Sequence, residues 1–364
     1  MDVKVFVELL QVALGNRTCL SQTPSEKGWY ELYSMCQKQS IAPFLFTALD
    51  GLNKSGQKPP MPLLYEWIGI SEQVKSQNKL MNQEAARLTK LFEVAGHRTA
   101  ILKGQANARL YPQPWSRQPG DIDIWVDGGR DKVVETLKNL GMLATDSLHN
   151  NIIGDATISY HHIDLPKNER GIDVEVHFRP SSGNLNPFTN KRLQSFLEKE
   201  ICDENSLVEE GFRVPSVKFA LVMQLAHIQR HLLSEGVGMR QIIDYYYLLK
   251  SDVNNQRDDV FYLLKSFGLR HMAESLMWFL HELLGLEEKY LIAPVDEKRG
   301  NLLLRAVMEG GNFGHHYFDE KETGVVGKMY ANHKKRLQLL RFDVPEAICN
   351  ELYSFYCFFT KMKK

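Results

Sequence analysis

Apolar residues recur at helical spacing near both ends of the chain and alternate with polar residues in its middle. Apolar positions repeat every three or four residues in Val3–Leu14, in Leu63–Ala95 and again in Val217–Leu233. This period predicts amphipathic helices, and strict alternation predicts strands. We therefore expect an α+β fold in three parts: an N-terminal helical segment over 1–95, a core with a small mixed sheet over 96–185, and a C-terminal helical domain over 186–364.

The first strong strand signal is Asp121–Val126, with the sequence DIDIWV. Successive side chains of a strand point to opposite faces, so Asp121 and Asp123 share one face. Ile122 and Ile124 lie on the other face and can be buried. The segment therefore predicts a strand that presents two carboxylates on one side.

A second acidic strand follows at Ile172–Phe178. Alternation places Asp173, Glu175 and His177 on one face and apolar residues on the other. Ile158–Leu165 also has a strand pattern, and the intervening residues favour a turn, so we predict a hairpin of these two strands.

Two neighbouring carboxylates repel each other, and each raises the pKa of the other. A divalent cation such as Mg²⁺ relieves this repulsion, because it takes carboxylate and phosphate oxygens as ligands. The alternative is a solvated edge strand with two acidic residues and no ligand. The third acidic strand about 50 residues later favours the metal interpretation.

Composition excludes several classes of protein. The 364 residues are 43% hydrophobic and 24% charged, with 44 basic and 44 acidic residues. The zero net charge makes nucleic acid an improbable partner, since nucleic-acid-binding domains are usually basic. Five scattered cysteines and the absence of a long apolar run indicate a cytoplasmic protein without a membrane anchor.

The motifs LKG at 102–104, LYPQPWSRQPGDIDIWV at 110–126 and VEVHFR at 174–179 together resemble the nucleotidyltransferase superfamily with the DNA polymerase β-like palm. They most resemble an uncharacterised bacterial nucleotidyltransferase family. The resemblance implies that Asp121, Asp123 and Glu175 are catalytic and bind two Mg²⁺ or Mn²⁺ ions. Asp173, on the same face as Glu175, is the alternative third ligand.

The same resemblance implies further contacts for a nucleoside triphosphate and its acceptor. Lys103, Gly104 and Arg117 are candidates for phosphate contacts, and His177 lies beside the acidic positions. His231, Arg240 and Asp244, from the helical region, would face the acceptor side. The turn reads Lys-Gly-Gln, where the superfamily usually has Gly-Gly or Gly-Ser.

The expected activity is metal-dependent transfer of a nucleoside monophosphate from a triphosphate to a hydroxyl acceptor, either a small molecule or a protein. One alternative is an inactive nucleotidyltransferase fold that serves as a binding or regulatory protein. The other is a glycosyltransferase with an Asp-x-Asp motif. We favour it less, because its motif follows a nucleotide-binding βαβ half, whereas mostly helical residues precede Asp121 here.

Overall fold

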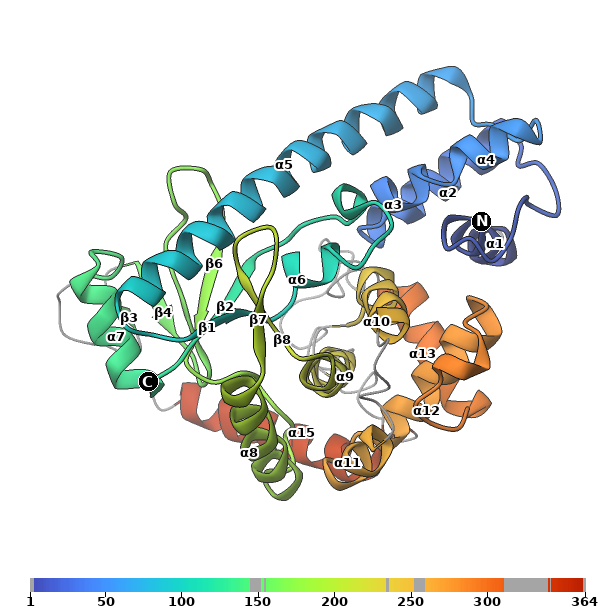
Figure 1. Ribbon diagram of the computed structural model, residues 1–364. Helices are drawn as coiled ribbons and strands as arrows, with labels where there is room; N and C mark the ends of the chain where they lie inside the picture. Colours follow the sequence, from blue (N-terminus) through green and yellow to red (C-terminus); the bar gives the residue numbers. More distant parts are fainter. Residues whose placement is uncertain are drawn as a thin grey trace. The chain divides into compact units, whose positions relative to one another are not determined.

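A mixed β-sheet stands between helical segments in the order of the chain, which confirms the expected α+β class (Figure 1). Among the described helices, none is both long enough and apolar enough to cross a membrane. The computed structural model describes residues 3–144, 152–153, 155–233, 236–251, 259–310, 340 and 342–362.

The helices are the dominant elements. Ser25 and Ser216 cap two of them, because each hydroxyl accepts a hydrogen bond from a backbone N–H in the first turn, at 3.2 Å from Gly28 and 3.1 Å from Phe219. The helices before the sheet are α1 (Val3–Ala13), α2 (Glu26–Lys38), α3 (Ala42–Phe46), α4 (Leu49–Lys54) and α5 (Met61–Val94). Those between strands are α6 (Gln105–Ala108), η1 (Pro114–Ser116), α7 (Gly129–Asn139) and α8 (Pro187–Asp203). Those after the last strand are α9 (Val217–Leu233), α10 (Met239–Ser251), α11 (Val260–Ser266), α12 (Arg270–Trp278), η2 (Phe279–Leu283), η3 (Glu288–Tyr290), α13 (Glu297–Gly310) and α15 (Val344–Met362).

Six strands form one sheet in the order β1-β2-β6-β5-β4-β3. β2 and β6 are parallel, and every other neighbouring pair is antiparallel. A separate two-stranded hairpin joins β7 (Asn205–Leu207) and β8 (Arg213–Pro215). The strands of the large sheet are β1 (Thr99–Ile101), β2 (Ile122–Val126), β3 (Ile152–Ile153), β4 (Ala156–Ile158), β5 (His162–Asp164) and β6 (Val174–His177).

The chain folds into two compact units, each made of separate stretches of sequence. Unit 1 comprises Met1–Ile68, Gly183–Leu193 and Leu225–Lys364, and unit 2 comprises Gly69–Ser182 and Gln194–Gln224. All six strands of the large sheet lie in unit 2. The division along the chain at residues 95 and 185 stays a prediction.

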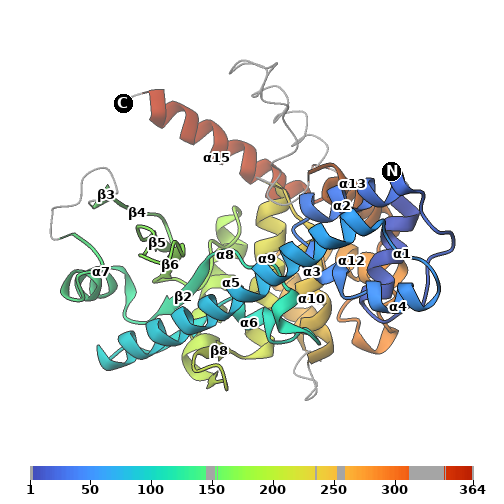
Figure 2. The same ribbon diagram turned by 90° about the horizontal axis from the view of Figure 1, so that it is seen from above.

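The core of unit 2 lies between α5 and one face of the sheet. Figures 1 and 2 both show α5 running across the strands. Leu88 and Phe92 of α5 are fully buried in one apolar cluster with Ile122 and Ile124 of β2. Because side chains alternate along β2, Asp123 points away from α5, toward the opposite face of the sheet.

In unit 1, the helices α12 and α13 pack against each other (Figure 1). Gly300 of α13 lies directly on the indole of Trp278. A Cβ added at Gly300 would lie 2.1 Å from the ring carbon Cε3. Since even an alanine would overlap the ring, this glycine sets how closely the two helices approach.

Two predictions of secondary structure need correction. Ile158–Leu165 is not one strand, because Ser159 turns the chain between β4 and β5. The N–H of Ser159 donates to the His162 carbonyl at 2.9 Å, and its hydroxyl accepts from the His162 N–H at 3.2 Å. Such local side-chain bonds compete with strand pairing. The sequence over 186–212 predicts only a linker and a helix, and this prediction misses the strand β7 and its hairpin with β8.

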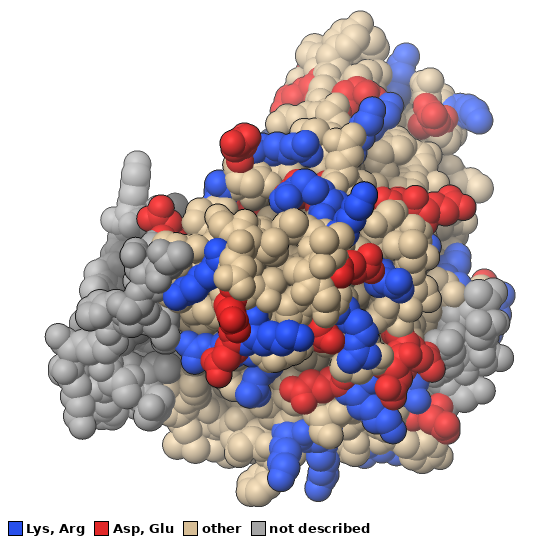
Figure 3. Space-filling model, turned by 60° about the vertical axis from the view of Figure 1, so that its left-hand side comes forward, with Lys and Arg blue, Asp and Glu red and all other residues tan. Residues whose placement is uncertain are grey.

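On the face shown in Figure 3, lysines and arginines are interspersed with aspartates and glutamates. This mixture agrees with equal numbers of basic and acidic residues.

Candidate active site

The register of three neighbouring strands gathers acidic and histidine side chains at one place. In the parallel pair of β2 and β6, Asp123 lies opposite Glu175 and Trp125 lies opposite His177. In the antiparallel pair of β5 and β6, Asp164 lies opposite Glu175. Because directly opposite residues project to the same face, the carboxylates of three strands meet there.

Lys103 neutralises the aspartate pair. It lies in the turn after β1, and its ammonium Nζ is 3.0 Å from Oδ2 of Asp123 and 3.7 Å from Oδ2 of Asp121. The backbone fixes this approach, because the N–H of Leu102 donates to the carbonyl of Asp123 at 3.0 Å. Lys103 is thus an ion-pair partner of both aspartates, a role that the sequence did not suggest.

His177 links the two strands that carry the acids. Its Nε2 is 3.0 Å from Oδ1 of Asp123 and 3.2 Å from Oε2 of Glu175. The side chains of Asp123 and His177 are 1% and 6% exposed. A carboxylate so deeply buried needs positive partners, and Lys103 and His177 supply them.

The electrostatics of the cluster shift four pKa values. Burial works against the charge on Asp123, but Lys103 and the hydrogen bond from His177 outweigh burial and hold the pKa of this carboxyl below its usual value. Burial also works against the charge on Lys103, whose pKa the acids nevertheless raise.

The pKa values of His177 and Glu175 are both raised, but for different reasons. Burial disfavours the imidazolium of His177, but the hydrogen bonds to Asp123 and Glu175 prevail and raise its pKa to about 9. Burial and the negative charge of Asp123 raise the pKa of Glu175 to about 7. In the metal-free protein, Glu175 therefore changes charge near neutral pH.

The two candidates for the third carboxylate have different surroundings. Glu175 lies within β6, beside Asp123. Asp173 precedes β6, and its Oδ2 is 3.1 Å from Nζ of Lys167, with the Asp173 side chain 55% exposed. The structure thus brings Glu175, and not Asp173, into the buried cluster.

Gly104 immediately precedes the short helix α6 and has a backbone conformation that favours glycine. Its φ is +62°, and a Cβ added there would lie 3.3 Å from the carbonyl oxygen of Asp121. A side chain at this position would be strained and would press on the turn that leads into the acidic strand. Arg117, the other candidate for phosphate contact, is buried, and its guanidinium donates to the carbonyl of Gln118 at 3.3 Å.

The remaining candidates are located in unit 1. His231 stacks edge-on against His227 with ring centroids 4.2 Å apart, and Arg240 and Asp244 are buried in α10. The i, i+4 spacing of Arg240 and Asp244 predicts an ion pair on a helix surface. This prediction is wrong about the surface, because both side chains are buried inside the unit. Their role on the acceptor side stays a prediction.

The cluster fits a hard divalent cation. Ligand atoms of Asp123, Glu175 and His177 all lie within 4.8 Å of one another, and Asp121 reaches the same ammonium as Asp123. A bound cation would relieve the repulsion that raises the pKa of Glu175, and carboxylate oxygens are the ligands that Mg²⁺ and Mn²⁺ prefer. Lys103 and His177 would then share or give up their carboxylate contacts.

Sequence reasoning missed three residues beside this cluster, namely His161, His162 and Asp164. His162 lies 3.5 Å from Oε2 of Glu175 through Nδ1 and 3.1 Å from Oδ1 of Asp164 through Nε2. His161 contacts His162 in turn, with Nε2 and Nδ1 2.9 Å apart. The signal was the hairpin itself, because an antiparallel register between β5 and β6 places His162 opposite His177.

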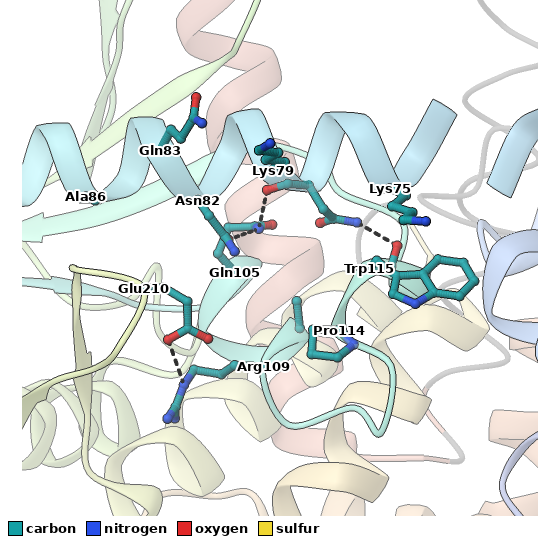
Figure 4. A pocket seen from close by; sticks show the side chains of 12 residues that line it. Lys75, Lys79, Asn82, Gln83, Ala86, Gln105, Arg109, Pro114, Trp115 and Glu210 are labelled. Carbon is teal, nitrogen blue, oxygen red and sulfur yellow. Dashed lines mark hydrogen bonds and ion pairs between the residues drawn. The ribbon is translucent and has the colours of Figure 1, made fainter. Parts of the chain in front are cut away.

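A cavity of about 710 Å³ lies elsewhere in unit 2, against α5 and α6 (Figure 4). Its wall carries the amides of Asn82 and Gln105, which hydrogen-bond to each other, and the ion pair of Arg109 with Glu210 at 3.8 Å. Trp115 adds an aromatic surface. The volume is that of a small-molecule site, but Asp121, Asp123 and Glu175 do not line it.

Comparison with known proteins identifies a family. The model of a family described as uncharacterised nucleotidyltransferase matches residues 25–285. No curated protein and no solved structure matches the chain.

Proposed function

The chain belongs to the uncharacterised nucleotidyltransferase family, and we propose that it transfers a nucleoside monophosphate from a nucleoside triphosphate to a hydroxyl acceptor. The observation that carries this proposal is the register of β2 and β6, which sets Asp123 beside Glu175. Asp121, Asp123 and Glu175 would hold Mg²⁺ or Mn²⁺. When bound, such ions lower the pKa of an acceptor hydroxyl and neutralise the leaving pyrophosphate.

The protein's own residues would mainly position the reactants, as is usual in phosphoryl transfer. His177 would orient Asp123 and Glu175 by donating Nε2–H to them. Lys103, placed between the aspartates and the Gly104 turn, would supply a positive charge to the phosphates. Gly104 leaves room for the triphosphate to approach the backbone. The acceptor would be a small molecule or a protein.

One observation favours a second candidate, an inactive fold that binds a partner without transfer. Lys103 and His177 already neutralise Asp123 through contacts of 3.0 Å each. A cluster that is satisfied by its own cations can persist without metal. Metal-dependent transfer separates the two candidates.

The test is a screen for label transfer from each of the four nucleoside triphosphates, labelled at the α-phosphate, onto a library of metabolites and proteins with Mg²⁺ or Mn²⁺. Asp121→Asn should abolish transfer, because it removes a metal ligand from a partly exposed position. Asp131→Asn, an exposed aspartate on α7, is the matched control and should leave transfer unchanged. Equal transfer by Asp121→Asn and the natural protein would contradict the assignment of the carboxylates.

A further inference from the structure

Three histidines lie together on one edge of the carboxylate cluster. The ring centroids of His161 and His162 are 4.2 Å apart, and that of His177 is 5.3 Å and 5.1 Å from them. One ring nitrogen of each lies within 4.8 Å of the others. The turn at Ser159 and the antiparallel register of β5 and β6 create this grouping, because they set His162 opposite His177.

The hydrogen bonds of His162 orient a lone pair toward His161. Nε2 of His162 lies 3.1 Å from the carboxylate of Asp164, and an Nε2–H donates to it. In that tautomer, Nδ1 of His162 carries a lone pair and faces Nε2 of His161 at 2.9 Å. A carboxylate that fixes the outer nitrogen of a histidine in this way is the usual support of a metal-binding imidazole.

A hydrogen on Nε2 of His161 can donate to this lone pair, since the two ring nitrogens lie at hydrogen-bond distance. A metal ion that accepts the lone pairs of both nitrogens would take the place of that hydrogen. Glu175 lies 3.5 Å from Nδ1 of His162, so a carboxylate is available as well. Imidazole ligands suit Zn²⁺, Co²⁺ and related ions, whereas Mg²⁺ prefers oxygen.

We propose that His161, His162 and His177 bind a divalent transition-metal ion of the Zn²⁺ class, at a site adjacent to the carboxylates. The site differs from the proposed catalytic one in its ligands, since His161 and His162 contribute nothing to the carboxylate set. It does not depend on nucleotidyl transfer, although the two sites share His177, whose Nε2 contacts Asp123 and Glu175. As a ligand, His177 would release a proton when the ion binds.

Cobalt is the probe, because Co²⁺ bound to nitrogen ligands absorbs visible light and Zn²⁺ does not. The full chain, stripped of metal with a chelator, is titrated with Co²⁺, and Zn²⁺ uptake is then measured by elemental analysis. We expect one ion per chain with histidine-type absorption. The double variant His161→Gln/His162→Gln should weaken Co²⁺ binding about tenfold or more, since loss of even an outer-shell partner costs metal sites about 10–100-fold.

His271→Gln is the matched control, because His271 is a partly exposed histidine of unit 1 that contacts Glu274 at 3.5 Å. It should leave Co²⁺ binding unchanged. If the far-ultraviolet circular dichroism spectrum shows that the double variant is unfolded, the single variant His161→Gln is used in its place. Its expected result is the same in direction, because it removes one of three nitrogen ligands.

Unchanged Co²⁺ affinity in His161→Gln would overturn the proposal, as would equal competition by Mg²⁺. A failure of the proposed function can be distinguished from a failure of the histidine site. Asp121→Asn should lose Mg²⁺-dependent triphosphate binding and keep the Co²⁺ spectrum. A protein that binds Co²⁺ through its histidines and binds no triphosphate would retain the histidine site and refute nucleotidyl transfer.

Discussion

Asp121 and Asp123 are two residues apart in the sequence but differ in what their charges do for the fold. Asp123 is 1% exposed and contacts both Lys103 and His177, whereas Asp121 is 33% exposed and contacts Lys103 at 3.7 Å. The removal of one partner from a buried ion pair leaves an uncompensated charge in the interior. Asp123 therefore has a structural role beside its proposed catalytic one.

We expect Asp123→Asn to destabilise the protein by about 3–5 kcal/mol, the usual cost of breaking a buried ion pair. Asp121→Asn should cost less than about 1 kcal/mol, because its charge is partly in water. Denaturant unfolding of both variants at neutral pH checks this difference. Equal stability of the two variants would show that the burial of Asp123 carries no energetic weight.

Because the pKa of Glu175 is raised to about 7, the affinity for metal should depend on pH. Below this value Glu175 is protonated and is a poor ligand. Affinity for Mn²⁺ should therefore rise as pH increases through about 7, with release of a proton on binding. Titration calorimetry in buffers of different ionisation enthalpy measures this release.

Glu175→Gln should remove the step in affinity near neutral pH and weaken binding at every pH. The imidazolium of His177, with a pKa of about 9, should add a second rise at higher pH. A natural protein whose metal affinity is flat between acidic and mildly alkaline pH would contradict the role of Glu175 as a ligand.

At the scale of the elements, the pairing of strands decides which of two acidic residues joins the cluster, a choice that the alternation of side chains leaves open. Alternation in the sequence placed Asp173 and Glu175 on one face and could not choose between them. In the structure, Ile122 pairs with Val174, so β6 begins after Asp173, and that side chain lies beside Lys167. No pattern within one segment contains this information, because it depends on which strand lies next to it.

The contact between α12 and α13 supplies a prediction about packing. Gly300→Ala places a methyl group inside the indole of Trp278, so the helices must move apart. We expect a loss of about 1–3 kcal/mol in the free energy of unfolding, as is typical of overpacked cores. Thermal and denaturant unfolding measure it.

Gly51→Ala is the matched control for this change. Gly51 is also a helical glycine of unit 1, and a Cβ there meets no atom within 4 Å. It should be neutral or stabilise by up to about 1 kcal/mol, because alanine favours helix over glycine. A Gly300→Ala protein as stable as Gly51→Ala would mean that the two helices separate without cost.

For the whole molecule, the sequence predicted the class of fold and the family, and these were confirmed. Each motif consists of residues close together in the sequence, so the sequence reveals it. Each compact unit instead combines stretches that are far apart in the sequence, and the divisions between the units fall within α5, α8 and α9. Sequence reasoning also missed His161 and His162 for this reason, since their importance depends on neighbours in space.

The discontinuity of unit 2 leads to a prediction about the segment 96–185 alone. Its apolar cluster includes Leu88 and Phe92 of α5 and Phe212, which follows β7. All three lie outside 96–185, and burial of each large side chain is worth roughly 1.5–3 kcal/mol. The isolated segment should therefore unfold without a cooperative transition, as measured by circular dichroism in denaturant. A sharp transition in this fragment would instead establish it as a domain.

The central claim is that Glu175 completes a metal site that binds a triphosphate. Its most direct test is calorimetric titration with each of the four nucleoside triphosphates, with and without Mg²⁺. Three proteins are compared: the natural chain, Glu175→Gln and the neighbouring control Asp173→Asn. We expect Mg²⁺-dependent binding in the natural chain and in Asp173→Asn, and binding weaker by about tenfold or more in Glu175→Gln. Triphosphate binding of equal strength with and without Mg²⁺ would contradict the claim. So would binding that is lost in Asp173→Asn and kept in Glu175→Gln.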